Sequence, residues 1–247
     1  MHKRSAVEVR KLVSETPDKL RDRFPASAHQ LYAYLHLVNA VGASGSPTPP
    51  RIAVTATETE EFRHKYGITG ETSLIGLNPG AEYGPAKRWP AEFFIRAAAR
   101  VEAMQPCAWL ITGAAADAGV ANEIATGIQK EHPAARIHNL AGRTSLRELC
   151  VAFELCAVVL TNDTGPMHLA AALGTPVVVP FGSTSPELTG PGIPGDERHR
   201  LILGQAPCAP CFLRECPIDL RCLRSISPET VAAEVLRAVR AQKELAH

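Results

Sequence analysis

Two clusters of polar and glycine residues in this chain have the composition of a ligand site. The first, Asn162-Asp163-Thr164-Gly165, follows the buried β-branched run Val158–Thr161 and precedes Pro166 and a short helical segment. Such a turn lies at the carboxyl end of a strand and at the positive end of a helix. In open α/β sheets, anionic ligands bind at that place. The segment therefore predicts an anion site.

The second cluster, Asn78–Pro90, also follows a predicted strand. Gly80 and Gly84 permit close backbone approach, and Lys87 and Arg88 bring positive charge to the carboxyl edge of the sheet. Amides and a point-charge lysine suit a phosphate group. The spacing matches neither a P-loop nor a dinucleotide fingerprint. The structural alternative is a solvated basic loop whose tryptophan is a packing anchor.

Composition indicates an ordinary soluble protein. The 247 residues are 45% hydrophobic and 21% charged, with a formal net charge of +1. This near-neutral charge, with scattered basic residues, gives no reason to expect nucleic acid as a partner. No apolar run is as long as a membrane span. The basic start Met1–Arg4 lacks a following apolar segment, so we expect no signal peptide and a cytoplasmic location.

Strands and helices alternate after about residue 50, which predicts an α/β fold with a doubly wound, mostly parallel sheet. The predicted strands are Arg51–Ala56, Ser73–Leu77, Ala108–Thr112, Arg136–Leu140, Val158–Thr161, Pro176–Phe181 and Arg200–Leu203. The predicted helices are Ala91–Met104, Asp117–Glu131, Ser145–Cys156, Met167–Leu173 and Pro228–Leu245. We expect two units, residues 1–50 and 51–247.

The first fifty residues have a different pattern. Helical segments at Val7–Leu12 and Asp18–Arg23 lead into an amphipathic helix over His29–Gly42, and Ala43–Pro50 has the Ser, Gly and Pro content of a linker. A helix without a partner sheet suits the end of a domain whose main body lies elsewhere. It equally suits a helical cap on the α/β domain.

The motifs together resemble a known family. Asn78–Ala81, Gly84–Pro90 and Thr161–Pro176 with Phe181-Gly182 are similar to the two signature blocks of the lipopolysaccharide heptosyltransferases, glycosyltransferase family 9. The Gly84–Pro90 segment is most similar to the type II members. Cys208–Cys222 also resembles a stretch found in many members.

This resemblance implies a GT-B fold and an inverting transfer of heptose from ADP-L-glycero-D-manno-heptose to the lipopolysaccharide inner core. The chain would supply the Rossmann-like donor lobe with a helical N-terminal remnant of the acceptor lobe. The resemblance implies no cofactor or metal, and a loose peripheral contact with the inner membrane. The family's catalytic base, near the start of the acceptor lobe, has no counterpart here. The alternatives are a catalytically inactive nucleotide-sugar-binding fragment or subunit and a GT-B transferase for another nucleotide sugar.

The resemblance also implies roles for individual donor-binding residues. Lys87 and the close-approach glycine Gly80 belong to the diphosphate loop, and the backbone amides of Thr164 and Gly165 would hold the same phosphates. Asp163 would accept hydrogen bonds from heptose hydroxyls. Its structural alternative is a helix N-cap.

Two further residues have open assignments. His168, one turn into the helix, either contacts the phosphates or supports residues that do. Asp117 lies where the family often carries an acidic residue for the ribose hydroxyls, and an N-cap of the helix Asp117–Glu131 is its alternative. No residue pair has a spacing that identifies a catalytic base.

Four cysteines near the C-terminus, Cys208, Cys211, Cys216 and Cys222, include one CxxC pair. Free structural thiols are the favoured interpretation, because the later spacings form no second CxxC and no histidine lies among them. A structural zinc is the alternative. A disulfide is disfavoured in the cytoplasm.

Overall fold

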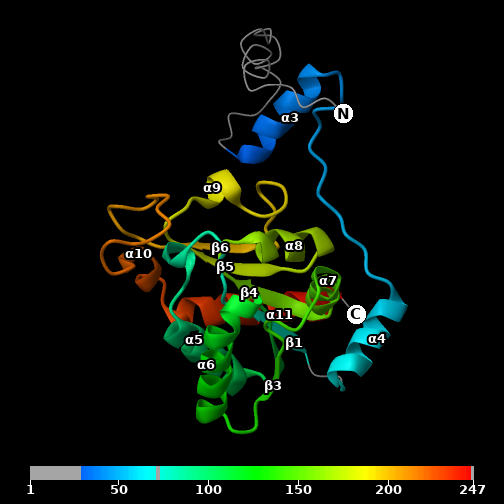
Figure 1. Cartoon of the computed structure of the whole chain (residues 1–247), viewed down its shortest axis with the longest axis vertical. Coiled ribbons are helices and arrows are strands. Elements are labelled where there is room, and N and C mark those ends of the chain that lie inside the picture. Colours follow the sequence, from blue (N-terminus) through cyan, green and yellow to red (C-terminus); the bar gives the residue numbers. More distant parts are fainter. Residues whose placement is uncertain (1–28, 71–72, 246–247) are drawn as a thin grey trace.

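The computed structural model describes residues 29–70 and 73–245, with one six-stranded sheet at its centre (Figure 1). The strands are β1 (Leu74–Asn78), β2 (Ala108–Ile111), β3 (Arg136–Asn139), β4 (Cys156–Thr161), β5 (Val177–Phe181) and β6 (Arg200–Leu203). Their order is β3-β2-β1-β4-β5-β6 and every neighbouring pair is parallel. This is the strand order of the Rossmann fold. The predicted α/β class and doubly wound sheet are confirmed.

Helices cover both faces of the sheet. One face carries α5 (Ala91–Met104), α6 (Ala118–Glu131) and α11 (Pro228–Leu245); the other carries α4 (Ala56–Tyr66), α7 (Leu146–Glu154) and α8 (Gly165–Leu173). Shorter elements are η1 (Pro85–Lys87), η2 (Ala115–Asp117), α9 (Pro186–Thr189) and α10 (Arg221–Arg224). Because the chain reverses its winding between β1 and β4, a crevice is expected at their carboxyl ends.

Each face of the sheet has its own apolar core. β4 shows the division, because Val158 and Leu160 join the core under α5 and α11 whereas Val159 joins the core under α7 and α8. All three side chains are buried. A strand covered on both faces needs this continuous apolar run, which is the pattern that identified it in the sequence.

The predicted strand Arg51–Ala56 is wrong. The chain there has no regular secondary structure up to Thr55, which is the N-cap of α4. Thr55 Oγ1 accepts a hydrogen bond from the Glu58 amide at 3.3 Å, and the Thr55 amide donates to Glu58 Oε2 at 2.8 Å. This reciprocal capping box fixes a helix start. It outweighs the short apolar alternation that suggested a strand.

The helix predicted over His29–Gly42 is present as α3 (Gln30–Ala40). It lies beside α9 and apart from the two helical layers (Figure 1), and none of its residues is buried. His29, which precedes it, is buried, and its Nε2 lies 3.1 Å from the Gly190 carbonyl oxygen. Residues 44–50 have no regular secondary structure. The predicted helices Val7–Leu12 and Asp18–Arg23 lie outside the described residues.

Candidate functional site

The two polar clusters meet at the carboxyl edge of the sheet. Asn78, the last residue of β1, is paired in register with Thr161, the last residue of β4. The loops that follow these strands therefore start side by side, although more than eighty positions separate them in the sequence. Their meeting point is the place where the strand order reverses, and open α/β sheets bind ligands there.

Lys87 and Asp163 form the central contact between the clusters. Lys87 Nζ lies 2.6 Å from Asp163 Oδ2, and the side chains are 13% and 5% exposed. Thr184, in the loop after β5, donates its hydroxyl to the same oxygen at 2.5 Å. Lys87 is therefore a shielded cation with a fixed position, and the alternative of a freely solvated basic loop is wrong for this residue.

Asn162 links the loop after β4 to the loop after β1 by hydrogen bonds. Its Oδ1 accepts the Trp89 amide at 3.0 Å, and its Nδ2 donates to the Pro79 carbonyl oxygen at 2.7 Å. Asn162 is fully buried, so these bonds form in a low-dielectric environment where each is strong. Trp89 is also buried, in the core under α5, so its predicted role as a packing anchor is confirmed.

The loop that carries Lys87 is held in place by hydrogen bonds to the cysteine-rich segment Cys208–Cys222. The Tyr83 hydroxyl donates to the Phe212 carbonyl oxygen at 2.9 Å, and Arg214 Nε donates to the Tyr83 carbonyl oxygen at 2.7 Å. Lys87 Nζ lies 5.0 Å from the centre of the Tyr83 ring, within cation–π range. At Gly84, whose φ is 156°, a Cβ would collide with the Arg214 carbonyl. Sequence reasoning gave Tyr83 no role, because its partners lie about 130 positions away.

A cavity of about 290 Å³ opens beside this contact, and we call it the carboxyl-edge cavity. It is lined by residues that follow β1, β2, β3 and β4, among them Gly80, Asp117, Thr144 and Thr164. A Cβ on Gly80 would collide with the Asp117 carboxylate, so only glycine allows the loop to approach Asp117 this closely. The structure thus brings three predicted site residues to one cavity: Gly80, Asp117 and Thr164.

Asp117 has one backbone partner. Its Oδ2 accepts the Ala114 amide at 3.0 Å, and Oδ1 lies 3.7 Å from Arg88 Nη2. Asp117 occupies the N-cap position of α6 but makes no side-chain capping bond there. The capping alternative is therefore not supported for α6, and the carboxylate faces the cavity.

The positive end of α8 lies at the same edge. Its N-cap is Thr164, whose side chain makes no capping hydrogen bond, and Pro166 in the first turn has no amide hydrogen. Asp163 is therefore not the N-cap of α8, because the next residue, Thr164, occupies that position. Thr164 and Pro166 line the carboxyl-edge cavity, so the positive end of the helix dipole acts on any anion held there.

His168 reaches the molecular surface on the next turn of α8. Desolvation by the surrounding protein lowers the pKa of its imidazole; the cationic Lys87 and nearby His29 act in the same direction, and Asp163 opposes them. The imidazole is therefore neutral at neutral pH. Within residues 29–70 and 73–245, no hydrogen bond joins His168 to the other candidate residues, so its role stays a prediction.

The cysteine cluster does not form a metal site among the described residues. Cys208, Cys211, Cys216 and Cys222 are free thiols, and no group of three or more His, Cys, Asp or Glu side chains in residues 29–70 and 73–245 is placed to hold a metal ion. No disulfide joins these four cysteines, and their interpretation as free structural thiols stays a prediction.

Comparison with known proteins gives consistent matches. The family model described as glycosyltransferase family 9 (heptosyltransferase) matches residues 16–221. Lipooligosaccharide heptosyltransferase 2 of Campylobacter jejuni is 32% identical over 173 residues, which cover 69% of this chain and 52% of that protein. Lipopolysaccharide heptosyltransferase 2 of Escherichia coli is 36% identical over 157 residues, covering 63% of this chain and 44% of that protein.

A solved structure, that of E. coli ADP-heptose LPS heptosyltransferase II, superposes with a TM-score of 0.68 and 27% identity. The superposed region covers 84% of this chain and 61% of the E. coli chain. The chain spans about half the length of the curated relatives that it matches.

Proposed function

Because the chain belongs to glycosyltransferase family 9, the heptosyltransferases, we propose that it supplies the donor-binding half of an inverting enzyme. This enzyme transfers heptose from ADP-L-glycero-D-manno-heptose to the lipopolysaccharide core. Residues 51–247 form the donor domain in this proposal, and residues 1–50 end the acceptor lobe. The likeness to type II enzymes of E. coli and C. jejuni supports the donor and acceptor classes.

The observation that carries the proposal is the shielded Lys87–Asp163 pair beside the positive end of α8. Loss of ADP concentrates negative charge on its diphosphate, and fixed positive groups there lower the barrier. Lys87 supplies a full charge, and the amides of Thr164 and Gly165 supply partial charges at a helix N-terminus. In the donor complex Asp163 keeps Lys87 in place and accepts hydrogen bonds from the sugar hydroxyls.

The carboxyl-edge cavity takes the nucleoside in this proposal. Asp117 presents a carboxylate to the ribose hydroxyls, and Gly80 allows the diphosphate to approach the backbone. The cavity lies next to Thr164, so a nucleoside within it places its diphosphate at the start of α8. Thr144 forms part of the wall after β3.

The chemistry is a displacement at the anomeric carbon. The C–O bond to ADP breaks through an oxocarbenium-like transition state while the acceptor hydroxyl oxygen attacks from the opposite face and loses its proton to a base. Among the described residues we assign no base, and the donor-side groups named above act only on the leaving group and the sugar.

The acceptor proposed here is a lipid-linked core at the cytoplasmic face of the inner membrane. We therefore propose a cytoplasmic location with a peripheral membrane contact. Within residues 29–70 and 73–245, no helix has the length and apolar character needed to cross a bilayer.

Calorimetric titration of the chain with ADP-heptose, ADP and UDP-glucose tests the proposal. We expect binding of both ADP ligands and weaker or no binding of UDP-glucose. Preference for UDP-glucose would contradict the donor assignment and favour another nucleotide-sugar transferase. ADP-heptose binding without transfer to a lipopolysaccharide core acceptor would favour a binding subunit over an enzyme that is active alone.

A further inference from the structure

The carboxylate of Asp163 uses its two oxygens unequally. Oδ2 accepts a hydrogen bond from Lys87 Nζ at 2.6 Å and another from the Thr184 hydroxyl at 2.5 Å. No hydrogen bond or ion pair joins Oδ1 to another residue in the described ranges 29–70 and 73–245. The side chain is only 5% exposed. Because an ionised carboxylate has about four acceptor positions, Oδ1 keeps its positions for water or a ligand.

A directional donor is needed to keep this division between the two oxygens. The χ2 torsion of an aspartate is broad and roughly twofold, so the carboxylate can exchange its oxygens by rotation. A lysine ammonium is a compact charge with three rotatable donors, and it can follow whichever oxygen faces it. Threonine is branched at Cβ and restricted at χ1, so its hydroxyl donates in a defined direction. Of the two partners, Thr184 is therefore the one that can hold the carboxylate in one orientation.

The loop after β5, which carries Thr184, is tied to the loop that carries Lys87. Phe212 makes the link, because its amide donates to the Ser183 carbonyl oxygen at 2.7 Å and its own carbonyl oxygen accepts the Tyr83 hydroxyl at 2.9 Å. Thr184 itself is 5% exposed, so it is packed on most sides. The two donors to the carboxylate therefore come from loops that are held together.

We infer that Thr184 is a positioning residue that sets the preference of the site for a nucleotide sugar over the bare nucleotide. By holding Oδ2 toward Lys87, it leaves Oδ1 of Asp163 as a fixed acceptor for a hydroxyl of the donor sugar. This inference rests on the proposed function, in which Asp163 accepts hydrogen bonds from the sugar. The diphosphate needs the charge of Lys87 and the amides at the start of α8, and neither depends on which carboxylate oxygen faces the sugar.

Calorimetric titration with ADP-heptose and with ADP separates recognition of the sugar from recognition of the nucleotide. Thr184→Val removes the hydroxyl and keeps the branched shape. We expect its affinity for ADP-heptose to fall about tenfold while its affinity for ADP stays within about twofold. Thr184→Ser retains a hydroxyl and is expected to restore most of the lost affinity. A hydroxyl that only stabilised the fold would leave the ratio of the two affinities unchanged.

Thr175→Val is the matched control. Thr175 is also 5% exposed, and its hydroxyl donates to the Phe153 carbonyl oxygen at 2.9 Å, but it precedes β5 and so lies at the opposite end of that strand from Thr184. We expect its ratio of affinities to equal that of the parent chain. The inference is overturned if Thr184→Val weakens binding of both ligands equally or of neither, or if Thr175→Val changes the ratio as much.

The carboxylate itself gives a readout that needs no ligand. The NMR resonance of the Asp163 side-chain carboxyl carbon responds to hydrogen bonds at its oxygens. We expect this resonance to move in Thr184→Val, to return in Thr184→Ser and to keep its position in Thr175→Val. An unmoved resonance in Thr184→Val would reject the orienting role. A resonance that moves as expected, in a chain that binds neither ligand, would reject the proposed function alone.

Discussion

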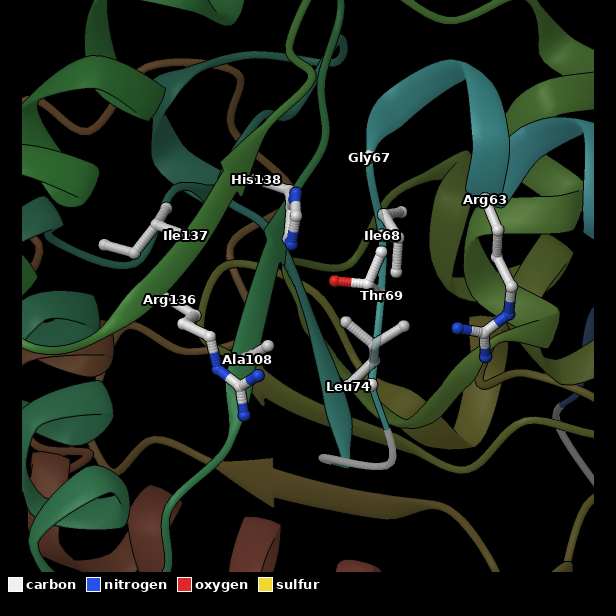
Figure 2. A pocket seen from close by; sticks show the side chains of 10 residues that line it. Arg63, Gly67, Ile68, Thr69, Leu74, Ala108, Arg136, Ile137 and His138 are labelled. Atoms are coloured by element: carbon white, nitrogen blue, oxygen red, sulfur yellow. The ribbon is translucent and has the colours of Figure 1, made fainter.

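Two cavities of similar size lie on opposite edges of the sheet, and only one has the features of a ligand site. The carboxyl-edge cavity is about 290 Å³. The other, about 260 Å³, lies where β1, β2 and β3 begin and is lined by Arg63, Arg136 and His138 (Figure 2). We call it the amino-edge cavity. Neither the cavity volume nor the presence of basic residues therefore shows which of the two cavities is a ligand site.

The two cavities differ in the structural elements that meet at each of them. At the carboxyl edge, loops from several strands are fastened together by buried contacts, and the start of α8 points its dipole at the cavity. The amino-edge cavity is formed by the segment after α4 and by the first residues of three strands. In a parallel sheet, the helix N-termini after each strand lie at the carboxyl edge, so the fold itself favours anions there.

Removing the buried carboxylate is the strongest test of this difference. Asp163→Ala leaves Lys87 largely buried without its ion-pair partner, and we expect the free energy of unfolding to fall by about 3 kcal/mol. A domain with ordinary stability stays folded after such a loss. Urea unfolding measures the change. Arg96→Ala, which breaks the exposed pair with Glu229, is the control and should cost about 1 kcal/mol or less. Equal losses in the two variants would contradict the account.

Removing the cation tests the anion site directly. Lys87→Ala is expected to weaken ADP binding about 10- to 100-fold, because a hydrogen bond to a charged group contributes about 1.5–3 kcal/mol. The control, Arg63→Ala at the amino-edge cavity, should bind ADP as the parent chain does. Calorimetry gives both affinities. If Arg63→Ala had the larger effect, the nucleotide would lie at the wrong edge of the sheet for this account.

Adding one methyl group tests the shape of the carboxyl-edge cavity. In Gly80→Ala the new Cβ meets the Asp117 carboxylate, so the loop must shift and ADP affinity should fall about tenfold, near 1.4 kcal/mol. Gly119→Ala is the matched control, because a Cβ there has no neighbour within 4 Å. A Gly80→Ala chain with unchanged affinity would show that the ligand does not approach this loop.

Removing a hydrogen bond between the Lys87 loop and the cysteine-rich segment should have the smallest effect on ADP affinity. Tyr83→Phe removes the hydroxyl that donates to the Phe212 carbonyl oxygen but keeps the ring beside Lys87. A single hydrogen bond contributes about 0.5–1.5 kcal/mol, so we expect a two- to fivefold loss of ADP affinity. Tyr34→Phe, on the exposed α3, should have no effect. Equal affinities in both variants would show that the cysteine-rich segment does not position Lys87.

Much of the fold was predictable because the signals were local. The run Val158–Thr161 identified a strand buried on both faces, and the predicted helix Met167–Leu173 and strand Pro176–Phe181 agree closely with α8 and β5. The start of α4 was missed because a capping box at Thr55 competed with a short apolar alternation.

The site was predictable only as two separate clusters. Lys87 and Asp163 were both candidates, but their direct contact depends on the parallel pairing of β1 with β4. Asn162 and Thr184 were missed as structural links, because their partners lie far away in the sequence and hydrogen-bond geometry has no local signature.

A crystal structure of the chain soaked with ADP tests the central claim most directly. The account predicts the diphosphate between Lys87 Nζ and the backbone amides of Thr164 and Gly165, with the ribose within hydrogen-bond distance of Asp117. ADP bound at the amino-edge cavity, or at the carboxyl edge without contact to Lys87, would contradict it.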